Sequence, residues 1–188
     1  MIQPCRLGKG IFLIAAPGLR DPNFRQTVVL LCEHSAEGAL GVVVNRPTGM
    51  MLAEALPQVP VLEGQSHRLF SGGPVQPNQI LILYRLTQEA TESHHVFDGV
   101  YLGGDLGMLE RVLAAAGAAH AFRAYVGYSG WGPGQLEDEM KTGSWITVPA
   151  DPVFVFETPP ERVWPDLLRS LGGPFEVYAD MPAEPSLN

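Results

Sequence analysis

The chain has 188 residues, a size typical of one domain, and 46% of them are hydrophobic, enough to fill a substantial core. Its formal net charge of -8 argues against direct binding of nucleic acid or of an acidic membrane, because the average surface repels polyanions and the twelve Lys and Arg residues are scattered in sequence. The two cysteines, Cys5 and Cys32, fit reduced cytosolic thiols better than a disulfide framework. No apolar run approaches the roughly 20 residues of a membrane-spanning helix, so we expect a cytoplasmic protein.

The first third of the chain is predicted to consist mainly of strands. Residues 10–17 form an apolar run that indicates a buried strand and is too short for a signal peptide. Residues 27–34 and 39–46 are two β-branched runs separated by four residues, a pattern typical of a hairpin. A short helix is expected over residues 51–56, with Thr48 as its N-terminal cap.

The rest of the chain alternates between strand and helix patterns. Residues 68–75 and 79–86 predict two strands joined by a Gly-Gly-Pro turn, and the polar residues 87–98 predict an exposed excursion. Further expected elements are strands over residues 100–104, 121–128 and 144–150, a helix over 105–117 capped by Asp105, and a helix over 158–173 in which Thr158 and Glu161 have capping-box spacing. The pattern predicts one α+β (mixed α/β) domain over residues 1–188, with a mixed β-sheet or barrel-like β core flanked by helices. A loose C-terminal tail is expected from about residue 181.

The stretch "GYSGWGPGQLEDEM" raises the question of a catalytic elbow or an anion site. A nucleophile elbow needs G-x-S-x-G spacing, but Trp131 occupies the place of the second glycine after Ser129, which disfavours a hydrolase. A helix that begins near Pro133 could bind an anion at its N-terminus. The acids at residues 137–139 would repel it, so they are interpreted as a solvated helix start. We predict a strand-to-helix corner whose glycines permit the turn.

The other reactive residue types give no constellation that sequence spacing can support. His94 and His95 are adjacent, so in an extended segment they point to opposite sides, and we interpret them as surface residues. Cys32 lies within a strand pattern and is expected to be a buried, inert thiol. No histidine or third carboxylate stands at metal-ligand spacing from Glu137 and Glu139. We therefore predict neither a metal site nor a cofactor.

Three segments together resemble one bacterial protein family. They are "PGLRDPNFRQTVVLLCEHSAEGALGVVVNRPT", "SGGPV" and "GYSGWGPGQLEDEMKTGSWITVPAD", and their order and spacing are similar to those of the YqgE/AlgH family from about Phe12 to Trp164. Ser129 stands where the family usually has alanine, which weakens the interpretation of this serine as a nucleophile. The matching motif positions are Asp21, Pro22, Phe24, Glu33, His34, Gly38, Asn45, Arg46, Pro47, residues 72–75 and 127–137, and Trp145.

The resemblance implies a single domain with a mixed β core flanked by helices, and it implies no established reaction, cofactor or catalytic residue. Family members are often labelled transcriptional regulators. A direct DNA binder would show a basic face and a reading helix, and neither is evident in a chain of this charge. A regulatory role is therefore expected to act through protein contacts.

The sequence favours a non-enzymatic, cytoplasmic binding or regulatory module with a protein partner, of unknown oligomeric state. The alternatives are an enzyme of unknown class, hydrolase-like, with a cleft near Arg46 and Glu137 and using His34 or Ser129, and a direct DNA-binding regulator. The candidate surface gathers polar and glycine-rich motifs that lie at strand ends, where loops can share one edge of the fold. Its predicted members are Asp21, Asn45, Arg46, Gly72, Gly73, Pro74, Trp131, Gln135 and Glu137.

Overall fold

The computed structural model describes residues 5–85, 94–103, 106–114 and 122–182. Ten strands join one hydrogen-bonded sheet in the order β10-β1-β2-β3-β9-β6-β8-β7, with β5 also pairing to β9 and β4 pairing to β5. The strands are β1 (Ile11–Ala15), β2 (Val28–Ser35), β3 (Gly38–Val43), β4 (Pro47–Met51), β5 (Arg68–Ser71), β6 (Val75–Arg85), β7 (His94–Phe97), β8 (Val100–Gly103), β9 (Phe122–Trp131) and β10 (Trp145–Pro149).

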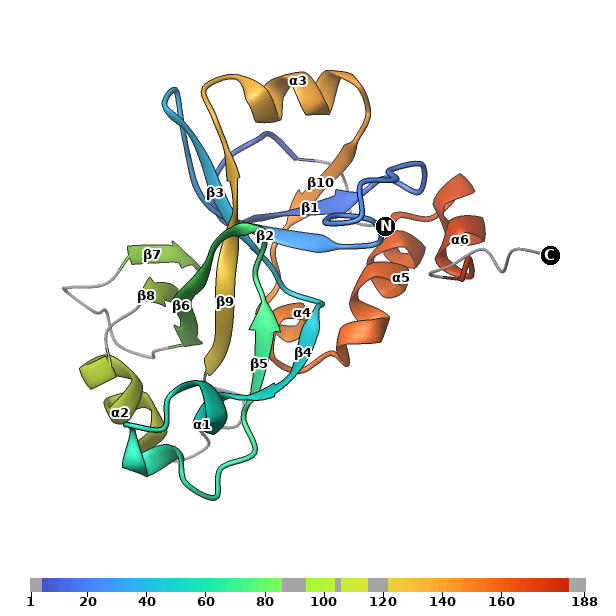
Figure 1. The fold of residues 1–188 in the computed structure, drawn as a ribbon. Helices are drawn as coiled ribbons and strands as arrows, with labels where there is room; N and C mark the ends of the chain where they lie inside the picture. Colours follow the sequence, from blue (N-terminus) through green and yellow to red (C-terminus); the bar gives the residue numbers. More distant parts are fainter. Residues whose placement is uncertain (1–4, 86–93, 104–105, 115–121, 183–188) are drawn as a thin grey trace.

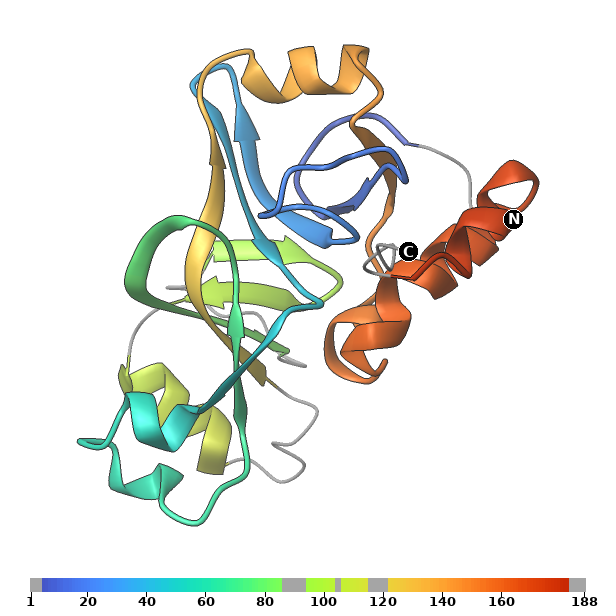
Figure 2. The ribbon, with the colours of Figure 1, turned by 45° about the vertical axis from the view of Figure 1, so that its right-hand side comes forward.

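Helices cover the sheet on several sides. In Figure 1, α3 lies above the end of β9, α1 and α2 lie below the sheet, α4 is seen between β5 and β4, and α5 and α6 lie to the right; the turned view in Figure 2 keeps α5 and α6 on one side. The helices are α1 (Leu52–Ala55), α2 (Leu106–Ala114), α3 (Gln135–Lys141), α4 (Pro152–Phe156), α5 (Pro160–Leu171) and α6 (Pro174–Ala179), with a 3-10 turn η1 (Pro60–Leu62). The predicted α+β fold class is confirmed.

The strand β9 connects the two parts of the sheet. Its C-terminal half pairs antiparallel to β3, and its N-terminal half pairs antiparallel to β6 and parallel to β5. The largest apolar cluster lies between the strands and α4 and α5, a second lies under α1 and α2, and a third lies between β1 to β3 and α3. Alternate residues of β9 join different clusters, with Ala124 in the second and Tyr125 in the largest, and Trp131 at the strand's end joins the third.

Several helix and strand boundaries differ from the sequence predictions. Thr48 is not a helix cap, because Pro47–Met51 forms β4 and α1 follows Met51 directly. Thr158 is not the cap of α5 either, since the helix begins after Pro159 and the hydroxyl of Thr158 donates instead to the carbonyl of Val153. Helices α4 and α6 had no sequence prediction.

Part of the predicted polar excursion at residues 87–98 is a strand. His94–Phe97 forms β7, and the side chains of Val96 and Phe97 are buried in the main cluster. This short edge strand was not predicted, because two polar residues followed by two apolar ones do not show the alternation typical of a strand. Residues 87–93 and the predicted cap Asp105 lie outside the described residues. Among the described residues, no helix has the length and apolar character needed to cross a bilayer.

Candidate functional site

The glycines of the "GYSG" motif lie inside β9 rather than in a turn, which corrects the sequence prediction. Gly127 has φ +69°, and a Cβ there would lie 2.4 Å from the carbonyl oxygen of Gly73. Gly72 and Gly73 are equally confined, because a Cβ on either would lie 2.3 Å from the backbone of β9. These glycines allow the loop between β5 and β6 to approach β9 at backbone contact distance.

Ser129 is fully buried and its hydroxyl donates to the carbonyl oxygen of Gly72 at 3.0 Å. The serine therefore ties the same loop to β9 and presents no free hydroxyl to solvent. Cys32 is also fully buried, and burial raises the pKa of its thiol far above the usual value. Neither side chain is available as a nucleophile in this structure.

Trp131, at the end of β9, packs into the third apolar cluster and is only 5% exposed. Its indole N–H donates to Oε2 of Glu139 at 2.9 Å, and the indole of Trp145 donates to the same oxygen at 2.8 Å. The ring of Phe24 stacks on Trp131 and meets Trp145 edge-on. Glu139 is therefore an internal acceptor for two buried indoles, and its interpretation as part of a solvated acidic helix start is wrong.

The helix α3 begins at Gln135, two residues after the predicted start at Pro133, with Gly134 in the left-handed conformation before it. The side chain of Gln135 joins this corner, accepting from the amide of Gly132 and donating to Glu139. Glu137 turns the other way and its Oε1 lies 2.7 Å from Nε2 of His34 on β2. That hydrogen bond is the main reason why the pKa of Glu137 lies below its usual value.

A cleft of about 680 Å³ opens beside this corner, between the β2–β3 hairpin, the end of β9 and β7. Its apolar floor contains Leu40, Val75 and Tyr128. The other lining residues are Lys9, Glu33, His34, Ser35, Glu37, Gly38, Ala39, His94, Gly130 and Trp131. We call this the motif cleft, because the segments that carry the family resemblance supply most of its walls.

The rim of the motif cleft carries charges of both signs. Glu33 and His94 face each other across it, with 3.6 Å between Oε1 and Nε2 and about half of each side chain exposed. The ammonium group of Lys9 donates to the carbonyl of His95 at 3.1 Å. Glu37 adds a further exposed carboxylate. Sequence reasoning missed Lys9 and His94 here, since only the folded chain brings β7 next to the residues that precede β1.

The first predicted group of site residues lies elsewhere, around a pocket of about 340 Å³ lined by Arg20, Pro22, Arg25, Gln26, Asn45 and Arg46. The amide of Asn45 accepts from Val28 N and donates to the carbonyl of Gln26, and the guanidinium of Arg46 donates to the carbonyls of Asn23 and Arg25. Asp21 is exposed and its carboxylate accepts from the amide of Asn23. These polar side chains hold the loop before β2.

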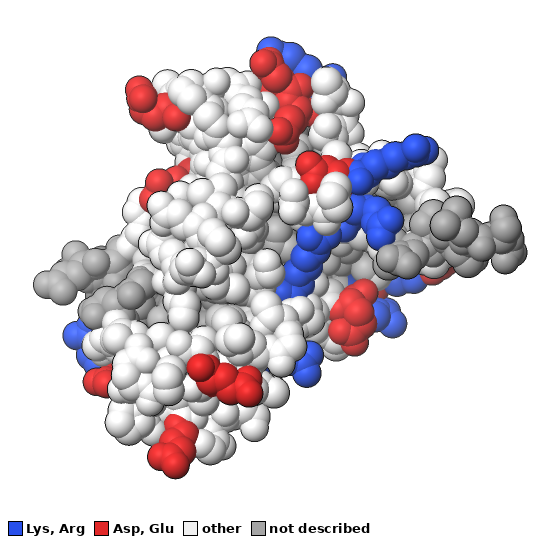
Figure 3. Space-filling view, in the orientation of Figure 1, with Lys and Arg blue, Asp and Glu red and all other residues white. Residues whose placement is uncertain are grey.

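Burial of the guanidinium, and to a smaller extent the nearby charge of Arg25, lower the pKa of Arg46. The carboxylate of Asp21 acts in the opposite direction and raises it. Three arginines that are separated in the sequence thus share one pocket, and Figure 3 shows basic side chains gathered in a stripe on this face. This local basic group could not be predicted from the sequence, because only folding joins the loop before β2 to the end of β3.

The predicted surface is therefore divided into three places. Asp21, Asn45 and Arg46 surround the loop before β2, while Gly72 and Gly73 lie against β9 with Pro74 exposed beside them. Trp131, Gln135 and Glu137 form the corner next to the motif cleft. Phe24 connects the first and third places through its contact with Trp131. The described residues include no group of three or more His, Cys, Asp or Glu side chains arranged to hold a metal ion.

The protein is a small α+β protein in which glycines let the loop between β5 and β6 pack closely against β9. A family profile described as AlgH-like matches residues 12–176, and the chain belongs to this family. A UPF0301 protein of Chlamydia felis is 36% identical over 182 residues, covering 97% of this chain and 96% of that protein. A UPF0301 protein of Streptomyces coelicolor is 38% identical over 182 residues, covering 95% and 94%. The resemblance drawn from the sequence is confirmed.

Two solved structures are similar to this one. The AlgH protein of Pseudomonas aeruginosa has a TM-score of 0.72 and 32% identity, covering 97% of this chain and 98% of that one. A protein of Corynebacterium diphtheriae has a TM-score of 0.80 at 23% identity, covering 96% and 95%, which establishes likeness of fold alone. The family descriptions name no reaction, ligand or partner.

Proposed function

We propose that this protein is a non-catalytic regulatory module that holds a polypeptide segment of a partner protein in the motif cleft. The observation that carries the proposal is the convergence of three distant segments on one cleft, to which they contribute Glu33, His34, Gly38, Val75, Tyr128, Gly130 and Trp131. Such convergence is expected where a surface has a task beyond holding the strands together.

The chemistry of the cleft supports a polypeptide. The floor of Leu40, Val75 and Tyr128 can receive an apolar side chain, and the mixed charges of Lys9 and Glu33 on the rim can pair with flanking charged residues. Glu33 and Glu37 disfavour a nucleic-acid phosphate backbone at the same place.

The non-catalytic part of the proposal is supported by the state of the two nucleophile candidates. Ser129 is hydrogen-bonded inside the strand and Cys32 is a buried thiol with a raised pKa. The predicted alternative of an enzyme with a cleft near Arg46 and Glu137 gains less support, since Arg46 lines the separate 340 Å³ pocket.

Site-specific photocrosslinking in cells tests the proposal. A benzophenone amino acid at exposed Glu37 on the cleft rim should give a discrete protein adduct, whereas the same group at Val177 on α6, 74% exposed and away from the cleft, should not. Leu40→Lys should abolish the adduct because it places a charge on the apolar floor, and Val177→Lys is the matched control. Equal adducts from both positions would contradict the proposal. If the protein turned over hydrolase or phosphatase substrates, and Glu33→Gln and His94→Ala abolished that turnover, the non-catalytic part of the proposal would be overturned.

A further inference from the structure

A third, smaller pocket lies at the opposite end of β9 from Trp131, between β5, the N-terminal end of β9 and the start of α5. It has a volume of about 230 Å³ and is lined by His67, Arg68, Phe70, Phe122, Arg123 and Pro160, among others. At about 30 Å³ for each water-sized group, it holds roughly eight such groups. The pocket is separate from the motif cleft and shares no lining residue with it.

Arg123 is a largely buried arginine with an incomplete set of hydrogen bonds. Its guanidinium lies over the ring of Phe70, 4.3 Å from the centroid, and Nη2 donates to the carbonyl of Phe156 at a long 3.4 Å. Nη1 is shut off from bulk solvent and has no hydrogen-bond partner among the described residues. Burial lowers the pKa of Arg123, but an arginine stays charged at neutral pH. A buried guanidinium with an unused donor is costly unless something accepts from it.

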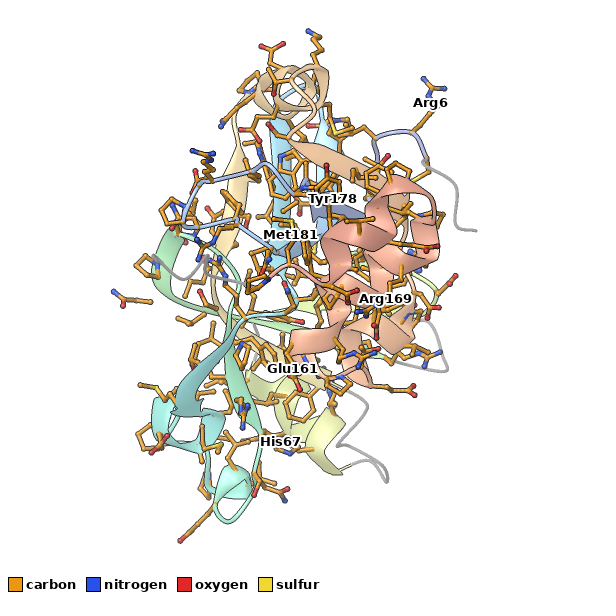
Figure 4. The ribbon with its side chains drawn as sticks, turned by 90° about the vertical axis from the view of Figure 1, so that its right-hand side faces the viewer. Arg6, His67, Glu161, Arg169, Tyr178 and Met181 are labelled. Carbon is orange, nitrogen blue, oxygen red and sulfur yellow. The ribbon has the colours of Figure 1, made fainter. Side chains whose placement is uncertain are left out.

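His67 supplies a second unused polar atom to the same pocket. Its Nε2 is buried without a partner among the described residues, and its ring packs on Phe122 with 4.5 Å between centroids. Its backbone is fixed by the hydrogen bond from the amide of Leu52 to its carbonyl at 2.8 Å. Burial lowers the pKa of His67, so the ring is neutral at pH 7 and one ring nitrogen can donate. Figure 4 places His67 just below Glu161, at the start of α5.

The charge around the pocket selects an anion. Among the described residues, the charged side chains that line it are Arg123 and, on the exposed rim, Arg68, whereas Glu161 is exposed and does not line it. The aromatic walls of Phe70 and Phe122 suit an apolar body.

We propose that this pocket binds a small organic carboxylate, with the carboxylate accepting from the guanidinium of Arg123 and the ring of His67, whose unpaired nitrogens turn toward the ligand on binding, and with its apolar body packed against Phe122. The guanidinium fork matches the planar carboxylate. The phenylalanine that lies under the guanidinium keeps the fork in place. Binding supplies the acceptors that the two buried nitrogens otherwise lack.

Benzoate is the probe for a calorimetric titration of the full chain, with benzyl alcohol as the neutral analogue and inorganic phosphate as the other anion. We expect saturable binding of benzoate alone, a loss of at least tenfold in affinity for Arg123→Gln and for His67→Phe, and no loss for Arg6→Gln, which changes an exposed arginine remote from the pocket (Figure 4). Circular dichroism checks that each variant is folded. If Arg123→Gln does not fold, His67→Phe still tests the proposal.

A second readout separates a ligand contact from a structural effect. Bound benzoate should raise the pKa of His67, followed by NMR of its ring protons, because a nearby negative charge favours the imidazolium. Equal binding of benzyl alcohol, stronger binding of phosphate than of benzoate, undiminished affinity in both pocket variants or no saturable binding would each overturn the proposal. Because the motif cleft and this pocket share no lining residue, these outcomes would not affect the proposal that the motif cleft binds a partner.

Discussion

The two ends of β9 differ in whether their buried polar groups have hydrogen-bond partners. At the C-terminal end, the indoles of Trp131 and Trp145 both donate to Glu139, so that the buried donors are paired. Near the N-terminal end, Arg123 and His67 line one pocket, and Nη1 of the first and Nε2 of the second have no hydrogen-bond partner among the described residues. Paired groups of the first kind fix a fold, and unpaired groups of the second kind reduce stability unless a ligand completes them. One strand thus carries a structural end and an end suited to binding.

Gly127→Ala should give the largest effect, because it disrupts the packing of β9 between its two ends. The new Cβ would lie 2.4 Å from the carbonyl of Gly73 at a positive φ, which combines backbone strain with overlap. We expect a loss of about 3 kcal/mol or more in the free energy of unfolding, measured by urea titration. Gly132→Ala is the control, because a Cβ there meets nothing closer than 4.0 Å. Similar losses in both variants would show that close approach is not the cause.

Glu139→Ala should damage the C-terminal end alone. Two buried indole N–H groups lose a charged acceptor, so we expect a loss of about 2–3 kcal/mol in the free energy of unfolding. Asp138→Ala on the exposed side of α3 removes only a surface pair with Lys141 and should cost less than about 1 kcal/mol. A Glu139 variant as stable as the Asp138 variant would contradict the structural role of the corner.

Arg123→Met should have the opposite sign. Methionine fills a similar volume against Phe70 and removes a buried charge that has one long hydrogen bond, so we expect the ligand-free protein to gain about 1 kcal/mol. Arg162→Met, at an exposed arginine paired with Asp166, is the control and should change little. A clear loss of stability in Arg123→Met would mean that the guanidinium is fully satisfied in the folded protein.

The smallest effect concerns Glu137 and His34 at the edge of the motif cleft. Because the folded-state pKa of Glu137 is lowered, its contribution to stability is present above the unfolded value of 4.5 and is lost as pH falls through the folded value. Glu137→Gln should therefore lower the melting temperature slightly near pH 6, and the difference from the wild type should shrink as pH falls below 4.5. The effect corresponds to less than about 1 kcal/mol, since the pair is partly exposed. A difference that grows as pH falls below 4.5 would contradict this assignment.

The sequence predicted what depends on local patterns. The strand runs around Phe12, Leu30 and Val42 and the helix containing Leu167 lie where hydrophobic periodicity places them. The role of Glu139 was missed because three consecutive acids after a proline are the usual pattern of a solvated helix start. Only the meeting of α3 with the ends of β9 and β10 reveals the two indoles that need an acceptor.

The candidate sites were less predictable for the same reason. The motif cleft needs Lys9 and His94, which are more than eighty residues apart, to meet beside β2. The pocket of about 230 Å³ needs the parallel pairing of β5 with β9, which places Phe70 next to Tyr125 and brings Arg123 over the phenylalanine ring. Parallel pairing between strands so distant in the chain leaves no local signal.

The placement of the tryptophans has a practical consequence. All three, Trp131, Trp145 and Trp164, are buried, two at the glutamate corner and the third donating to the carbonyl of Ala15. The tyrosines Tyr84 and Tyr101 instead stack on each other in the cluster under α1 and α2. Emission from the indoles therefore reports on the part of the sheet that contains β1, β10 and the end of β9. Absorbance of the phenols is a mixed signal, because Tyr125 and Tyr128 pack with the main cluster and Tyr178 is exposed on α6. An indole-emission melt compared with a melt followed by circular dichroism would show whether that part unfolds together with the rest.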